Sequence, residues 1–170
     1  MDKRWSVWLC PDSISQLATQ QLVNDCCGQF NLPVFEPHIT LFGRVETDPV
    51  PTFTFFEKLV RVFEPITLNV LGIKKGILPW KAIYLQMEKS DQLVLLQNKV
   101  NLYLNGYRCY EFDPHVSLAY GNLDINETEL SSISFPETIT FSSVALGTTP
   151  DEITDWKIIN RLNLREGASL

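Results

Sequence analysis

Apolar and polar positions follow two different periods along this chain, and the boundaries between them predict its elements. Two long segments have apolar residues at helical spacing together with start and stop signals. The first begins at a capping residue, Asp12 or Ser13, and runs to about Gly28. The second covers residues 91–104 and ends at Asn105-Gly106. In the first predicted helix, the apolar positions at this spacing are Ile14, Leu17, Ala18 and Leu22.

Short β-rich runs separate these helices. Further helices are predicted over residues 51–63, which end before a Glu-Pro pair, and over the acidic stretch 127–131. The predicted strands cover residues 4–9, the run around His38, and residues 66–78, 80–87, 112–120, 138–147 and 154–164. Strands and helices therefore interleave through short connections, which predicts the α+β class. Since no segment resembles a linker, we expect residues 1–170 to form a single domain.

The composition narrows the function classes. The chain has 170 residues, 45% hydrophobic and 20% charged, which suffices for one globular domain or two half-domains that share an interface. Its net charge of −6 argues against broad binding to duplex nucleic acid or to an anionic membrane, because both rely on many Lys and Arg contacts. The first residues contain too short an apolar run for a signal peptide, and no stretch reaches the length of a spanning helix. We therefore expect a cytoplasmic protein.

The four cysteines add no evidence for a special site. Cys10, Cys26, Cys27 and Cys109 have neither the spacing of metal ligands nor the density of a secreted disulfide framework. We interpret them as ordinary buried or half-buried thiols.

One seven-residue phrase occurs twice. Residues 35–41 read FEPHITL and residues 112–118 read FDPHVSL, and the only two histidines of the chain, His38 and His115, lie in these phrases. The two histidines are separated by nearly half the chain, and each phrase follows a predicted helix. We therefore predict two pseudo-symmetric lobes, each of which contributes one strand to a shared cleft.

Alternation along a strand places each histidine beside a hydroxyl. His38 and Thr40 share one face of their strand, and His115 and Ser117 share one face of theirs, while the residues between them face the core. If the chain stays extended through the proline of each phrase, the acids Glu36 and Asp113 lie on the same face. Either carboxylate is then able to orient its histidine. Pro37 and Pro114 suit the first residue of a strand and fix the direction in which each histidine enters it.

A pair of histidine and hydroxyl units suits the opening of a cyclic phosphodiester. Near neutral pH one imidazole can accept a proton from attacking water while the other donates a proton to the departing sugar oxygen. The hydroxyls can bind the non-bridging oxygens as charge builds on them. This scheme needs neither a metal nor a cofactor. A zinc site lacks further ligands, and a Ser-His-Asp hydrolase lacks its nucleophile elbow.

These residues resemble those of a known family. The pair PHIT and PHVS resembles the twin His-x-Ser/Thr motifs of the 2H phosphoesterase superfamily, and the flanking segments resemble its cyclic phosphodiesterase branch from fungi and plants. The similar segments are SVWLCPD, FEPHITLFG, EFDPHVSLAYGNL and TPDEITDWKIINRLNL, in the same order over nearly the whole chain.

The resemblance implies a bilobal α+β fold, with antiparallel sheets on either side of a central cleft and helices on the outer faces. It also implies metal-independent hydrolysis of ADP-ribose 1″,2″-cyclic phosphate to ADP-ribose 1″-phosphate, of nucleoside 2′,3′-cyclic phosphates to nucleoside 2′-phosphates, or of both. By this resemblance the catalytic residues are His38 and His115 with Thr40 and Ser117, and the aromatic residues of the substrate pocket are Trp8 and Tyr120. For Trp8, an ordinary core position is the alternative.

Two other functions stay open at this point. One is a 2′,5′-RNA phosphoesterase or ligase-like enzyme, which the acidic net charge disfavours because a long RNA needs a basic groove. The other is a module that binds a nucleotide or an RNA end without turning it over. The expected partner is a small cyclic phosphate or nucleotide, and the expected state is a monomer. Arg44 and Lys81 are candidates for phosphate contacts, but we leave them out of the site because such residues are more often solvated surface charges.

Overall fold

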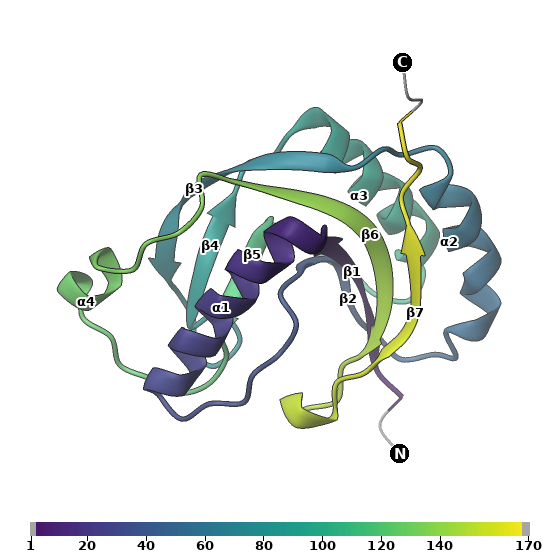
Figure 1. Cartoon of the computed structure of the whole chain (residues 1–170). Coiled ribbons are helices and arrows are strands. Elements are labelled where there is room, and N and C mark those ends of the chain that lie inside the picture. Colours follow the sequence, from purple (N-terminus) through teal and green to yellow (C-terminus); the bar gives the residue numbers. More distant parts are fainter. Residues whose placement is uncertain (1–2, 168–170) are drawn as a thin grey trace.

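A seven-stranded antiparallel sheet with helices packed on it forms the body of the protein (Figure 1). We analysed a computed structural model, which describes residues 3–167. The strands are β1 (Trp5–Pro11), β2 (Ile39–Val45), β3 (Ile66–Lys75), β4 (Ile83–Met87), β5 (His115–Ala119), β6 (Thr138–Thr148) and β7 (Ile158–Asn163). The helices are α1 (Ser13–Gln29), α2 (Phe53–Val60), α3 (Asp91–Leu104) and α4 (Glu127–Ser131), with 3₁₀ turns at Val50–Thr52 and Ile153–Asp155. The α+β class is thus confirmed.

The helices start where the sequence provides caps. The Asp12 carboxylate accepts a hydrogen bond from the Ser15 N–H at 2.7 Å at the start of α1, and the side chain of Ser90 does the same for α3. α4 begins with a complete capping box made by Asn126 and Glu129. Within residues 3–167, no helix combines the length and the apolar character needed to cross a membrane.

The buried face of α1 differs from its most apolar stripe. Ile14 and Leu17 are 79% and 76% exposed, whereas the helix is buried through Thr19, Val23 and its two cysteines. Thr19 tolerates this position because its hydroxyl donates to the Ser15 carbonyl at 2.7 Å. Small side chains let the C-terminal half of α1 lie close to the sheet, so helical spacing identified the helix but not the side that faces the core.

The element order is repeated along the chain. The series β1-α1-β2-α2-β3 is followed by β4-α3-β5-α4-β6, and β7 is then added at the edge of β6. The sheet order is β1-β2-β5-β4-β3-β6-β7, and β6 pairs with β1 as well. The third strand of each series therefore pairs with the first strand of the other. Since all seven strands belong to one continuous sheet, the division into two lobes stays a prediction.

Each series also packs its first helix on the central strand of the other series. α1 lies against β5 and α3 lies against β2 (Figure 1). Two matching hydrogen bonds support this exchange: Cys27 Sγ donates to the Leu118 carbonyl at 3.4 Å, and Gln97 Nε2 donates to the Leu41 carbonyl at 3.1 Å. Leu41 and Leu118 end the two repeated phrases, so both phrases are held on their core side by a helix from the other series.

Candidate active site

The two repeated phrases meet at the pairing of β2 with β5. Ile39 and Val116, each of which follows a histidine, are antiparallel partners and are fully buried. Antiparallel geometry around this pair puts His38 beside Ser117 and Thr40 beside His115 on the opposite face of the sheet. The four predicted residues therefore share one surface. β5 is shorter than the predicted strand over residues 112–120, and β2 begins directly after His38, because regular pairing begins only after the prolines.

Both imidazoles are held by main-chain carbonyls. His38 Nδ1 lies 2.7 Å from the carbonyl oxygen of Glu36, and His115 Nδ1 lies 2.8 Å from that of Asp113. A carbonyl can only accept, so each Nδ1 carries the proton and each Nε2 is left as the basic nitrogen. The expected orienting contacts from the carboxylates are not formed. The Glu36 carboxylate instead pairs with Arg161.

The Asp113 carboxylate is likewise turned away from its histidine. It pairs with Lys81 and accepts a hydrogen bond from Gln86 Nε2 at 2.9 Å. Burial alone would raise the pKa of Asp113, but these two partners hold that pKa below its ordinary value. Asp113 is therefore a carboxylate at neutral pH, and its charge is engaged by Lys81.

Burial keeps both histidines neutral. It lowers the pKa of His38 from 6.5 to about 4, against the raising effect of the Glu36 carbonyl, and a charge on His115 would lower it further. The pKa of His115 is lowered as well, by burial and by the charge of Lys81. The effect of His115 on the pKa of His38 agrees with the positions of the two rings on one face. At neutral pH the site thus presents two neutral imidazoles.

The two predicted aromatic residues are both buried. The Trp8 ring stacks on the His38 ring, with centroids 4.1 Å apart, and only 3% of Trp8 is exposed. Gly147 lies directly behind Trp8, and a Cβ there would come within 2.4 Å of the indole. Trp8 therefore packs as a buried residue and supports one face of His38.

Tyr120 is 8% exposed and lies among other aromatic rings. Its ring centroid lies 4.5 Å from that of Phe35 and 5.3 Å from that of Trp156. Burial raises the pKa of Tyr120 to about 12, so its phenol stays protonated over the physiological range.

The hydroxyl of Ser117 is poorly satisfied. Its Oγ is buried and makes no well-formed hydrogen bond within residues 3–167, although Ser117 lies near enough to the Tyr120 phenol to lower its pKa. Such a group costs roughly 1–3 kcal/mol, which native proteins usually avoid. Thr40 is half-buried at the opposite corner of the same four-residue surface. An oxygen atom of a bound ligand would provide the missing hydrogen-bond partner for this hydroxyl, next to a neutral imidazole.

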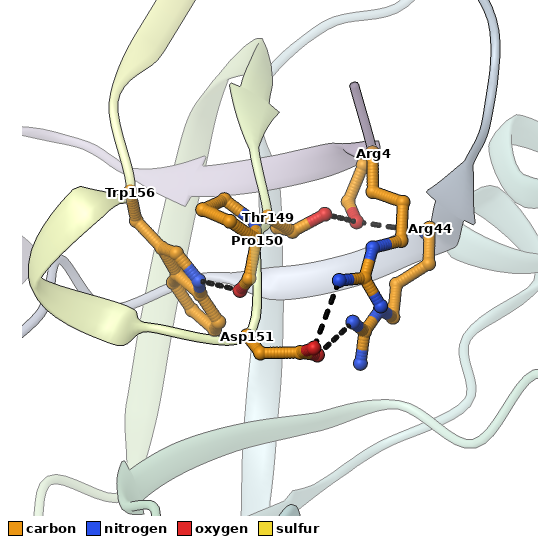
Figure 2. Close-up of polar contacts among 7 residues, drawn as sticks. Arg4, Arg44, Thr149, Pro150, Asp151 and Trp156 are labelled. Carbon is orange, nitrogen blue, oxygen red and sulfur yellow. Dashed lines mark hydrogen bonds and ion pairs between the residues drawn. The ribbon is translucent and has the colours of Figure 1, made fainter. Parts of the chain in front are cut away.

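Three aromatic residues near the histidines or Tyr120 were not predicted from the sequence. The Tyr84 ring lies edge-on to His115 at 5.5 Å, the Trp80 ring lies 6.2 Å from Tyr120, and the Trp156 ring lies 6.1 Å from His38. Trp156 is fixed by a hydrogen bond from its Nε1 to the Pro150 carbonyl at 2.9 Å (Figure 2). The sequence signal for Trp156 was its place in the closing segment TPDEITDWKIINRLNL, which resembles the family.

Arg44 and Lys81, the two cations left out of the site, are both ion-paired. Arg44 has a φ of 57° and reaches the Asp151 carboxylate, which Arg4 also contacts at 3.0 Å (Figure 2). The Arg44 guanidinium also lies 5.2 Å from the centroid of the Trp80 ring. Arg44 therefore connects the β6–β7 connection to the β3–β4 connection.

Two cavities are lined by residues that contact the histidines or their segments, although neither has His38 or His115 in its wall. One of 160 Å³ is lined by Trp8, Phe35, Glu36 and Trp156, among others. A larger one of 530 Å³ lies between the start of α1 and strands β6 and β7, with Glu36 and Arg161 in its wall. In the described part of the chain, no group of three or more His, Cys, Asp or Glu side chains is arranged to hold a metal ion.

Comparisons with known proteins agree with this arrangement. A family model described as "cyclic phosphodiesterase-like protein" matches residues 3–165. A cyclic phosphodiesterase of Arabidopsis thaliana is 22% identical over 123 residues, which cover 72% of this chain and 68% of that protein. Among solved structures, TT0787 of Thermus thermophilus has a TM-score of 0.68 at 14% identity and covers 96% of this chain and 98% of its own.

LigT of E. coli, solved with 3′-AMP, has a TM-score of 0.65 at 15% identity, with 96% of this chain and 99% of that chain covered. LigT was also solved with ATP and with NADP⁺. At such identities these structures establish a shared fold.

Proposed function

Because the chain belongs to the cyclic phosphodiesterase-like family of 2H phosphoesterases, we propose that it hydrolyses cyclic phosphodiesters with His38 and His115 as a general base and acid pair. Family membership makes it a phosphoesterase; the histidine pair and the substrate are the proposal. The observation that carries it is the matched tautomer of the two rings, each with Nδ1–H on a carbonyl and Nε2 left basic.

The proposed reaction transfers two protons. A water molecule attacks phosphorus and gives its proton to the Nε2 of one neutral histidine, while the bond from phosphorus to a sugar oxygen breaks. That oxygen takes a proton from the Nε2 of the other histidine, which must already be an imidazolium, a state that the nearby anionic substrate favours. Thr40 and Ser117 donate hydrogen bonds to the non-bridging oxygens. The product is a phosphomonoester on an opened ring.

The unequal burial of the rings favours unequal roles. His38 has a pKa of about 4 and stays neutral in the free protein, as a base must. His115 is only half-buried, so protonation costs it less, and we assign it the role of acid. A substrate with sulfur as the leaving atom tests this assignment, because a thiolate leaves without a proton. His115→Ala should then lose far less activity than His38→Ala.

Nucleotide-sized cyclic phosphates are the proposed substrates, either ADP-ribose 1″,2″-cyclic phosphate or nucleoside 2′,3′-cyclic phosphates. Trp156 is half-buried and Trp80 is 42% exposed, so their rings can offer a face to a base or a ribose, and such stacking contributes about 1–3 kcal/mol per base in single-strand binders. LigT was solved with 3′-AMP, with ATP and with NADP⁺, which supports a substrate of nucleotide size.

A panel of cyclic phosphates tests the proposal, with phosphorus NMR to assign each product. We expect turnover in excess chelator, a bell-shaped pH profile, and loss of activity in both His38→Ala and His115→Ala. If a nucleotide binds and every member is recovered unchanged, the site is a binding module. If either variant keeps wild-type turnover, the two-histidine mechanism is wrong.

A further inference from the structure

The segments that carry the two orienting carbonyls have no regular structure of their own. Residues 32–38 and residues 108–114 precede β2 and β5 without belonging to a helix or a strand. A carbonyl in such a segment changes direction with small changes in φ and ψ. Something outside the segment must therefore fix the carbonyls of Glu36 and Asp113 if the imidazoles are to keep one orientation.

A cation from another element anchors each segment. Arg161 on β7 pairs with the Glu36 carboxylate, and Lys81, just before β4, pairs with the Asp113 carboxylate. Gln86 adds hydrogen bonds of 2.9 Å to the Asp113 carboxylate and to the Pro114 carbonyl. In both phrases the acidic side chain is held by a cation while the carbonyl of the same residue holds the histidine.

The two anchors come from parts of the chain that are not repeated. Arg161 lies on β7, which follows the second series, whereas Lys81 lies in the connection between β3 and β4. Duplication of the phrase therefore accounts for the acids but not for their partners. That both acids nevertheless have a cation indicates that each anchor serves the function of its histidine.

We infer that Arg161 and Lys81 are positioning residues, each of which holds an acidic residue whose main-chain carbonyl fixes the ring of a histidine. Each cation holds its acidic residue in place, so the carbonyl of that residue stays on the Nδ1–H of the histidine. The proton then remains on Nδ1, and Nε2 remains the basic nitrogen. The consequence for catalysis rests on the proposed function, whereas the consequence for ring orientation does not.

The rival explanation is that the cations bind the substrate phosphate directly. Both cations are engaged with carboxylates in the structure, which already compensate their charge, although each keeps further N–H donors. The two explanations differ in their kinetics. A lost phosphate contact raises KM, whereas a misplaced imidazole lowers kcat, and a small misplacement can cost about 100-fold.

The tautomers can be observed directly. The chain has only two histidines, so long-range ¹H–¹⁵N spectra of tag-free protein at pH 7.5 report these two rings alone. We expect the Nδ1–H tautomer for both rings in the wild type. Arg161→Met should give a mixture of tautomers for His38 only, and Lys81→Met a mixture for His115 only. Arg161→Lys, which keeps the charge, should retain much of the wild-type pattern.

Matched controls separate positioning from general loss of an ion pair. Arg165→Met removes a similar pair, Arg165 with Glu64, near the same end of the chain, and should leave both rings and kcat unchanged. Glu36→Ala removes the anchor from the other side but keeps the carbonyl. The double variant Glu36→Ala/Arg161→Met should be no worse than either single variant, because the two residues act as a unit.

The expected kinetic result for Arg161→Met is a fall in kcat of roughly 10- to 100-fold with KM nearly unchanged. Unchanged tautomers in both Arg161→Met and Glu36→Ala would overturn the inference, and so would a rise in KM at constant kcat. If the protein cleaves no cyclic phosphate, the spectra still decide whether the anchors position the rings. Failure of the proposed function is thereby distinguished from failure of this inference.

Discussion

The burial of His38 makes the stability of the protein depend on pH in a defined window. In the folded protein the pKa of His38 is lowered from 6.5 to about 4, because the ring is 4% exposed and packs against Trp8. In the unfolded chain the ring has its ordinary pKa. As the pH falls from 6.5 to 4, the unfolded state therefore binds a proton that the folded state does not.

The size of this effect follows from the two pKa values. One pKa unit corresponds to about 1.4 kcal/mol, so the complete shift is worth about 3 kcal/mol of unfolding free energy. This stability is fully present above pH 6.5. About 2 kcal/mol of it is lost by pH 5, and the rest is lost as the pH falls through about 4.

Replacing the ring removes the effect, so His38→Gln is the test. Urea unfolding of both proteins at pH 7.5, 6.0, 5.0 and 4.5 gives the difference in unfolding free energy at each pH, and titrations common to both proteins cancel. We expect that difference to move by about 2 kcal/mol in favour of the variant between pH 7.5 and 5.0. A constant difference would show that His38 titrates normally in the folded protein, which would refute both its burial and its assignment as the neutral base.

Three further variants test other parts of the site. Lys81→Met removes a charge that lowers the pKa of His115, so the alkaline limb of the activity profile should move to higher pH; an unmoved limb would contradict this. Ser117→Ala removes a buried hydroxyl that makes no well-formed hydrogen bond, so unfolding should show equal or higher stability, by up to about 1 kcal/mol, while kcat falls about 100-fold. Gly147→Ala puts a Cβ within 2.4 Å of the Trp8 ring and should cost about 1–3 kcal/mol in thermal unfolding, whereas an unchanged Tm would mean that the indole moves aside freely.

The elements were predictable where local signals decide them. The helix over residues 91–104 and the acidic helix over residues 127–131 were predicted with their observed boundaries, because each has its caps in the sequence. Predicted strands were too long at the ends where turns intervene. The strand predicted over residues 154–164 begins only at Ile158, because a 3₁₀ turn occupies its first residues.

The pairing of strands and the packing of helices between the two series were not predictable from periodicity. No local pattern specifies that β6 pairs with β1, or that α1 packs on β5 and not beside its own neighbours. The exposed Ile14 and Leu17 illustrate the same limit. A periodic pattern reports an available apolar stripe, whereas the side that is buried depends on which strand the tertiary structure brings to the helix.

The candidate site was also predictable only in part. Alternation along a strand needs only the sequence, and it placed His38 with Thr40 and His115 with Ser117 on one face. Tyr84 on β4 and Trp156 before β7 reach the histidines from separate parts of the fold, and Trp80 reaches Tyr120. Their approach depends on tertiary packing, so residue type alone could not single any of them out.

The acids of the two phrases show why a repeated residue can be identified correctly and yet be misinterpreted. Alternation of side chains along an extended chain suggested that the carboxylates of Glu36 and Asp113 face the histidines. A proline lies between each acid and its histidine, however, and changes the direction of the chain. The main-chain carbonyl then faces the ring, and every residue type has one. Selection for that carbonyl alone would not retain an acid. An acid at both positions therefore requires a separate use of the carboxylate, and its pairing with Arg161 or Lys81 provides one.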